Sequence, residues 1–302
     1  MDILSQGITE EIYQNLYMGS EREMMWHCNA DPRFSYHTYI PENYREYKEK
    51  KLKLISFVHG TGRTIEWYRS LFKDFADKNG FAMIFPMFPG GLMDKNDFNS
   101  YKLLEYNGVR YDNIFLAMID ELAERFPIDI DKIYLYGWSG GGQFVHRFLY
   151  VHPERLAAVV IGAPGRPTYI DPGEDYYWGI RNFQEIFDKP FDIEKIRKVP
   201  VKILVGEEDT LYVGESKWGT SRMERLINLR KNYEKNGLNV SMDIIPGIGH
   251  KGHDDIKSKY VLDFFLDVLS KQNNQTTTSD FPCNFNFTVS NMNRFNQGID
   301  HG

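Results

Sequence analysis

The sequence predicts an α/β fold, a three-layer α/β/α sandwich with a mostly parallel, twisted β-sheet. Short apolar runs recur along the chain, and most are continuous rather than alternating, as in strands buried on both faces. Segments with helical periodicity separate these runs, which is the pattern of strands joined by right-handed helical crossovers. A length of 302 residues suffices for one large domain of this class.

The expected elements follow one another in a regular order. The strands are expected at residues 33–41, 53–60, 81–88, 132–137, 157–164, 201–209 and 240–247, because each is rich in Val, Ile, Leu or Phe. Apolar residues recur at helical spacing in the segments between them, and two of these segments end on Asn-Gly, a typical C-terminal stop. The expected helices cover 65–80, 111–126, the segment after residue 140, 221–237 and 255–270.

Three segments fall outside this alternation. Residues 1–30 are expected to form an N-terminal extension before a main domain at 31–270. Residues 165–198 delay the next strand for too long to be a simple connection, which predicts a small cap insertion over one edge of the sheet. Residues 271–302 are rich in Asn, Gln and Thr, and we expect a poorly ordered tail or an arm that packs its phenylalanines on a neighbour.

Composition excludes several functional classes. The net charge of −6 argues against a nucleic-acid partner. The chain shows no signal-peptide pattern and no apolar run long enough to span a membrane, so we expect a cytoplasmic protein without a membrane partner. The two cysteines, Cys28 and Cys283, have no paired or metal-like spacing, which argues against a disulfide framework or a cysteine zinc site.

One serine lies in a glycine-rich turn between an expected strand and an expected helix. The stretch Gly137-Trp138-Ser139-Gly140-Gly141 matches G-x-S-x-G in the strand–turn–helix context of a nucleophile elbow. Such a turn exposes the serine hydroxyl, and it requires small residues two positions to either side. A structural turn is the plain alternative, whereas a phosphate-binding loop would carry Lys where Gln143 follows.

A serine hydroxyl needs a base, and the base needs an orienting acid. Asp209 ends one later expected strand, and His250 follows the next strand in the loop PGIGH. Because both stand where a strand opens into a loop, they can meet Ser139 at one edge of the sheet. The chain order Ser, Asp, His is the order expected for this turn.

Neighbouring residues compete for these two roles. Glu207 and Glu208 precede the favoured Asp209, and His253 follows His250 closely. His253 is better explained as the residue that starts the last helix. A metal site would draw on the histidines and aspartates of residues 250–255, but no further ligand is evident, and we expect no metal.

The reaction also needs donors for a developing oxyanion. One is expected to be the backbone N–H of Gly140. The other is expected from the loop His59-Gly60-Thr61-Gly62, where Thr61 is favoured over Gly62. Small residues in this loop let its backbone approach a substrate carbonyl closely.

The stretches YIPENY, VHGTG, GWSGGG, GEED and GIGH, in this order, resemble the α/β-hydrolase superfamily. The similarity extends over residues 33–270 and is greatest to esterase members related to polyhydroxybutyrate depolymerases and feruloyl esterases. The resemblance implies that Ser139, Asp209 and His250 form the catalytic triad and that no cofactor is needed.

The expected function is therefore a serine carboxylesterase that cleaves a small or aryl ester, a small-molecule substrate, through an acyl-enzyme. The same fold and residues would also suit two alternative functions, a peptidase of the prolyl-oligopeptidase type and a thioesterase. A ligand-binding homologue without catalysis is a third alternative. The aromatic residues near the serine and in the expected cap either wall the substrate pocket or fill the core of the cap, and they are Trp138, Tyr176, Tyr177 and Trp178.

Overall fold

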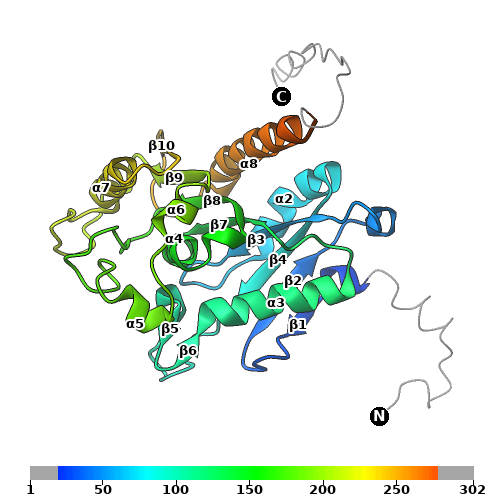
Figure 1. The fold of residues 1–302 in the computed structure, drawn as a ribbon, viewed down its shortest axis with the longest axis horizontal. Coiled ribbons are helices and arrows are strands. Elements are labelled where there is room, and N and C mark those ends of the chain that lie inside the picture. Colours follow the sequence, from blue (N-terminus) through cyan, green and yellow to red (C-terminus); the bar gives the residue numbers. More distant parts are fainter. Residues whose placement is uncertain (1–19, 278–302) are drawn as a thin grey trace, which may run out of the picture. The chain divides into compact units, whose positions relative to one another are not determined.

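The computed structural model describes residues 20–277 (Figure 1). The chain divides into two units, residues 1–265 and 266–302, and the sheet and the candidate site belong to the first. The described part of the second unit, residues 266–277, is the end of helix α8 (Asp254–Thr277). The expected tail therefore begins as helix. Its residues from 278 onward, including Cys283, and residues 1–19 of the expected extension lie outside the described residues.

An eight-stranded sheet forms the centre of the first unit. Six neighbouring strands are parallel, and the two at one edge pair antiparallel, so the predicted mostly parallel sheet is confirmed. Every expected strand is present. In spatial order the strands are β1 (Met25–His27), β2 (Ser35–Tyr39), β4 (Phe81–Met87), β3 (Lys53–Val58), β7 (Ile133–Trp138), β8 (Leu156–Gly162), β9 (Val201–Gly206) and β10 (Val240–Ile245).

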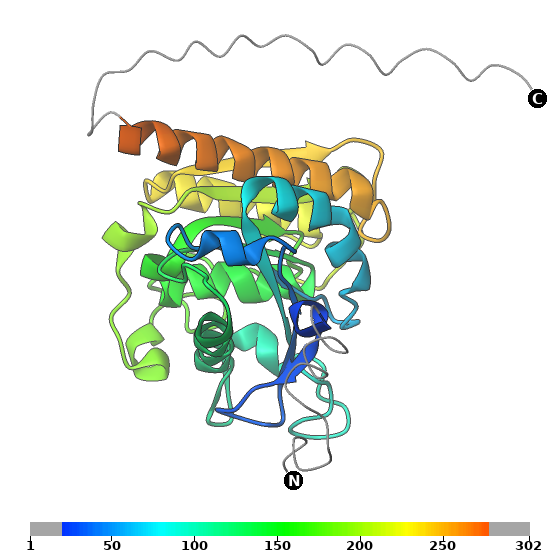
Figure 2. The same cartoon turned by 90° about the vertical axis from the view of Figure 1, so that its right-hand side faces the viewer.

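The main helices cover both faces of this sheet, as predicted. They are α2 (Glu66–Asn79), α3 (Tyr111–Arg125), α4 (Gly140–Val151), α7 (Arg222–Lys235) and the part of α8 up to Phe265. Helix α2 and the first part of α8 share one face, where Tyr136 of β7 meets Tyr68 and Tyr134 meets Phe265 at ring distances of 5.8 and 5.3 Å. Helices α3 and α4 pack together on the other face (Figure 2).

Several elements were not expected from the sequence. Strand β1 lies inside the segment expected to be an extension, where it pairs with β2 as the edge of the sheet. Strands β5 (Glu105–Tyr106) and β6 (Val109–Arg110) form a small hairpin before α3. No helix between residues 20 and 277 combines the length and apolar character needed to cross a bilayer.

The segment expected to be a cap lies between β8 and β9. It contains two short helices, α5 (Phe183–Phe187) and α6 (Ile193–Ile196), and an irregular stretch before them. This stretch is bonded to α4 through Arg166, whose carbonyl accepts from Arg147, and through Thr168. The N–H of Thr168 donates to Nε2 of His146 at 2.8 Å, and its carbonyl accepts from the hydroxyl of Tyr150 at 2.8 Å. The stretch is thereby attached to the helix that follows Ser139.

Candidate active site

Ser139 stands in the turn between β7 and α4. Its backbone has φ 57° and ψ −111°, a conformation that non-glycine residues rarely adopt. Two glycines make the turn possible. A β-carbon on Gly137 would lie 2.4 Å from the carbonyl carbon of Gly141, and one on Gly141 would lie 2.0 Å from the carbonyl oxygen of Val58. The sharp turn therefore accepts only glycine at these positions.

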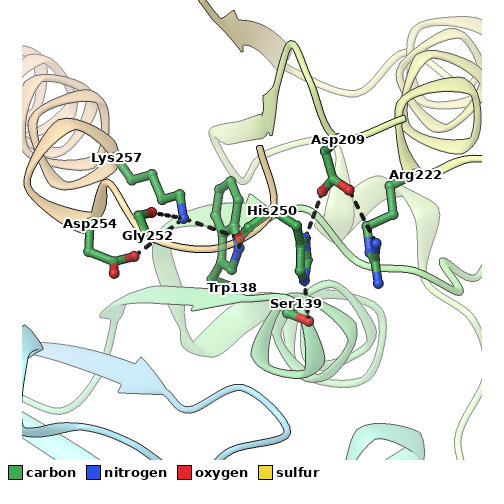
Figure 3. Close-up of polar contacts among 8 residues, drawn as sticks. All are labelled: Trp138, Ser139, Asp209, Arg222, His250, Gly252, Asp254 and Lys257. Atoms are coloured by element: carbon green, nitrogen blue, oxygen red, sulfur yellow. Dashed lines mark hydrogen bonds and ion pairs between the residues drawn. The ribbon is translucent and has the colours of Figure 1, made fainter. Parts of the chain in front are cut away.

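The structure brings Ser139, His250 and Asp209 into one chain of hydrogen bonds (Figure 3). Nδ1 of His250 lies 2.6 Å from Oδ2 of Asp209, and Nε2 lies 2.9 Å from Oγ of Ser139. Because an ionised carboxylate only accepts, Nδ1 carries the proton. Nε2 is then free to accept the proton of the serine hydroxyl, which is the arrangement that general-base activation requires.

Parallel strands place the acid and the histidine at the same edge. Asp209 follows β9 and is 1% exposed, whereas Glu207 and Glu208 are exposed. The carboxylate of Glu207 instead accepts from the N–H of Gly247 at 3.0 Å. His253 is exposed as well. The structure thus places the alternatives to Asp209 and His250 outside the hydrogen-bonded chain.

Two side chains hold the loop of His250 through its main-chain carbonyl. The indole N–H of Trp138 donates to the carbonyl of His250 at 3.0 Å, and Nζ of Lys257 lies 3.3 Å from the same oxygen (Figure 3). The ammonium also sits 4.3 Å from the centre of the Trp138 ring, within range of a cation–π interaction. Lys257 is buried, and this burial lowers its pKa. Trp138 therefore supports the histidine loop.

The loop after β3 is held next to the serine turn. His59 accepts the N–H of Phe88 through Nε2 at 3.0 Å, so Nδ1–H donates to the carbonyl of Gly60 at 2.8 Å. Burial lowers the pKa of His59 to about 4, which keeps the ring neutral near pH 7. A β-carbon on Gly140 would lie 3.1 Å from the backbone nitrogen of Thr61. The two expected oxyanion donors therefore lie close together.

A cavity of about 430 Å³ opens beside Ser139. Tyr177 lines it, but Trp138, Tyr176 and Trp178 do not, contrary to the expected pocket wall. The hydroxyl of Tyr176 donates to the carbonyl of Leu103, and the ring of Trp178 lies under the guanidinium of Arg225 at 5.3 Å. The described lining residues are Thr61, Asn99, Lys102, Leu103, Ser139, Gln143, Gly165, Arg166, Tyr177, Val213 and Arg222.

No metal-binding cluster is evident in the part of the chain from residue 20 to residue 277. There, no three or more His, Cys, Asp or Glu side chains are grouped to hold an ion. The chemistry that this arrangement can support directly is proton transfer and nucleophilic attack by Ser139.

The sequence profile of the prolyl oligopeptidase family matches residues 67–275, which is more than half of the chain. The chain belongs to the prolyl oligopeptidase family. The matched range includes Ser139, Asp209 and His250. Together with its structural neighbours, membership of the prolyl oligopeptidase family makes the chain a serine hydrolase of the α/β-hydrolase fold, as the sequence resemblance implied.

Solved structures with the same fold include several hydrolases. The poly(3-hydroxybutyrate) depolymerase LpqC from Bordetella parapertussis has a TM-score of 0.61 and 20% identity over 78% of this chain and 85% of its own. Poly(aspartic acid) hydrolase-1 from Sphingomonas sp. KT-1 has a TM-score of 0.58 and 21% sequence identity, and the match covers 76% of this chain and 92% of that one. Est1E from Butyrivibrio proteoclasticus, solved with ferulic acid bound, has a TM-score of 0.52 and 19% sequence identity, and the match covers 82% of this chain and 99% of that one.

At these identities the structural similarity shows the fold that this prolyl oligopeptidase family member shares with those enzymes. No curated protein matches the chain in sequence.

Sequence reasoning missed the cationic residues of the cavity. Lys102 lies in a 3-10 helix (Ser100–Leu103), Arg166 lies in the irregular stretch after β8, and Arg222 begins α7. None of them follows a strand directly, so the strand pattern does not point to them. The only signal in the sequence was Ser221-Arg222-Met223-Glu224, which predicts a helix N-terminus near the site.

Proposed function

We propose that this member of the prolyl oligopeptidase family is a carboxylesterase that cleaves a small or aryl ester through an acyl-enzyme. The observation that supports the proposal is the continuous chain of hydrogen bonds from Asp209 through His250 to Ser139, which lines an open cavity. Ser139 would be the nucleophile, His250 the general base and Asp209 the orienting acid.

In the acylation step, Oγ of Ser139 attacks the ester carbonyl carbon while Nε2 of His250 takes its proton. Asp209 stabilises the resulting imidazolium through Nδ1–H. The tetrahedral intermediate then breaks its bond to the alcohol oxygen, and Nε2–H protonates the leaving alkoxide. Ser139 now carries the acyl group as an ester.

In the deacylation step, water replaces the alcohol as the attacking group. His250 takes a proton from this water, and the hydroxide attacks the acyl carbon. The second tetrahedral intermediate releases Oγ of Ser139, which recovers its proton from His250. The products are a carboxylic acid and an alcohol, and the enzyme returns to its starting state.

The backbone N–H groups of Gly140 and Thr61 would stabilise the oxyanion in both intermediates. Their proximity supports this role, and the N-terminus of α4 adds a favourable dipole. Loss of one such donor typically lowers kcat by about 10²- to 10³-fold.

A peptidase is the second candidate, because the matched family is that of prolyl oligopeptidase. A peptidase that recognises a free amino terminus needs a carboxylate near the scissile bond to bind the ammonium. None of the described residues lining the cavity is acidic. The lining therefore favours an ester over a peptide with a free amine.

The test is hydrolysis of p-nitrophenyl acetate, butyrate and octanoate by the wild type and by Ser139→Ala. We expect kcat to fall by about 10⁴- to 10⁶-fold in the variant. Ser70→Ala, an exposed serine on α2, is the matched control and should retain wild-type activity. A wild type that cleaves N-acyl dipeptide p-nitroanilides but no ester would establish the peptidase, and an active Ser139→Ala would contradict the proposed nucleophile.

A further inference from the structure

The cavity beside Ser139 is lined by positive charge. Lys102, Arg166 and Arg222 face it, and none of the described lining residues is acidic. The chain as a whole carries a net charge of −6, so the charge of the cavity is opposite to that of the molecule. A concave site of one sign with low-dielectric walls attracts ligands of the other sign.

Lys102 brings a buried ammonium group to the cavity. The residue is 6% exposed, and Nζ donates to Oγ1 of Thr61 at 2.7 Å and to Oδ1 of Asn99 at 2.6 Å. Both acceptors are neutral, and an ammonium has three hydrogens. Burial and the nearby positive charges, Arg63 first among them, lower the pKa of Lys102 to about 8. No carboxylate in the described chain forms an ion pair with it.

Arg147 adds a second buried cation behind the wall. It is fully buried, and its guanidinium donates to the carbonyl of Lys102 at 2.5 Å, the carbonyl of Arg166 at 2.7 Å and Oγ1 of Thr168 at 2.9 Å. All these acceptors are neutral. Arg147 therefore adds positive charge, with no carboxylate bonded to it among the described residues, directly behind the lining residues Lys102 and Arg166.

Arg222 lines the same cavity and carries one side-chain donor without an acceptor in the described chain. Nη1 bonds to Oδ1 of Asp209 at 3.1 Å, whereas Nε is buried with no acceptor among the described residues. Nε lies 3.5 Å from where a β-carbon on Gly165, another lining residue, would stand. Among residues 20–277, Asp209 is the carboxylate that pairs with Arg222, and it also accepts from His250, so it does not neutralise the three lining cations.

We propose that the cavity recognises a carboxylate on the substrate, bound chiefly by Lys102 and Arg166. The preferred esters are then half-esters of dicarboxylic acids, or O-acyl hydroxy acids in which the hydroxyl is esterified and the carboxylate is free. The proposal rests on the proposed function for the bond that is cleaved. A single negative charge fits better than a phosphate dianion, because the carboxylate of Asp209, which is bonded to the lining residue Arg222, would repel the second charge.

The first experiment compares esters that differ only by a carboxylate in place of a methyl group. Monomethyl glutarate and methyl valerate place the difference on the acyl side, and 3-acetoxypropanoate and propyl acetate place it on the alcohol side. Hydrolysis is followed by pH-stat at pH 7. We expect kcat/KM to favour the carboxylate by about tenfold or more in at least one pair, the effect of one charge-assisted hydrogen bond. Equal values within both pairs would overturn the proposal.

The second experiment assigns the preference to residues. Lys102→Met should lower the preference about tenfold and Arg166→Gln several-fold, whereas Lys102→Arg should retain most of it because the charge remains. Lys78→Met is the matched control, because Lys78 lies in the last turn of α2, at the opposite end of the sheet. An unchanged preference in both Lys102→Met and Arg166→Gln would contradict the assignment.

A third measurement separates this proposal from the proposed function. Glutarate and inorganic phosphate are titrated calorimetrically into Ser139→Ala, which needs no catalysis. Glutarate binding that weakens about tenfold when Lys102→Met is added supports the carboxylate site even if no ester is cleaved. Ester hydrolysis without carboxylate preference or glutarate binding leaves the esterase and overturns the site. Phosphate binding without glutarate binding also overturns it.

Discussion

The two sides of the cavity are built in different ways. On one side, Ser139, Asp209 and His250 follow the parallel strands β7, β9 and β10, so the backbone ladder of the sheet sets their spacing. On the other side, the wall comes from a 3-10 helix and the irregular stretch after β8, which a few side-chain hydrogen bonds hold together.

This difference suggests a division of labour. Residues fixed by the sheet keep the short distances that bond cleavage needs, and changes to them should lower kcat. Residues of the wall contact the rest of the substrate, and changes to them should alter the choice of substrate through kcat/KM. The following predictions test this division in order of decreasing effect.

After Ser139 itself, the largest effect is expected at Asp209. Replacement by Asn removes the charge and lets the side-chain amide favour the wrong tautomer of His250, so kcat should fall by about 10³- to 10⁴-fold with little change in KM. Glu208→Gln, an exposed neighbour, is the control and should match the wild type. Steady-state kinetics on p-nitrophenyl butyrate checks both variants. A large loss in Glu208→Gln would reverse the assignment.

A smaller effect is expected at Lys257, which bonds to the main-chain carbonyl of His250. Lys257→Met removes one donor to the carbonyl of His250, but Trp138 still holds it, so kcat should fall about tenfold while KM stays constant. Lys259→Met, exposed two residues later on α8, should have no effect. Urea unfolding of both variants shows whether the lower kcat comes from a displaced His250 or from a less stable fold. A change in KM alone would place Lys257 in substrate binding.

The smallest effect is expected from pH at the wall. Lys102 has a pKa of about 8 in the folded protein, so it is charged at pH 7 and mostly neutral at pH 9. The ratio of kcat/KM for monomethyl glutarate to that for methyl valerate should therefore fall about fivefold between these values. The charged groups near Lys102 are Arg63, Arg147, Arg166 and Asp97. A ratio equally steep in Lys102→Met would refute this explanation.

Much of the fold could be predicted from the sequence because the strands are long and apolar. The runs at β3, β4, β7, β8 and β9 are buried on both faces, and such runs differ clearly from the amphipathic helices between them. Strand β1 could not be predicted, because three residues with an exposed methionine carry no period. The hairpin of β5 and β6 is shorter still.

The strand pattern also explains which residues of the site could be predicted from the sequence. Ser139, Asp209 and His250 follow strands, and the strand pattern located them. The wall was misjudged because an aromatic residue in a loop can point to either side. Trp138 is next to Ser139 in sequence, yet its indole faces Lys257 and the histidine loop. Side-chain direction in such segments depends on hydrogen bonds between residues distant in the chain, such as those of Arg147.

The bonds of Arg147 also bear on protein engineering. A loop that replaces residues 165–182 needs two groups to keep the hydrogen bonds of Arg147. These are one main-chain carbonyl and one hydroxyl, which Arg166 and Thr168 now provide. The helix and the strand ends would keep their native sequence in such a chimera. This loop is therefore the place to concentrate randomised codons when a library is built to change which substrates the hydrolase accepts.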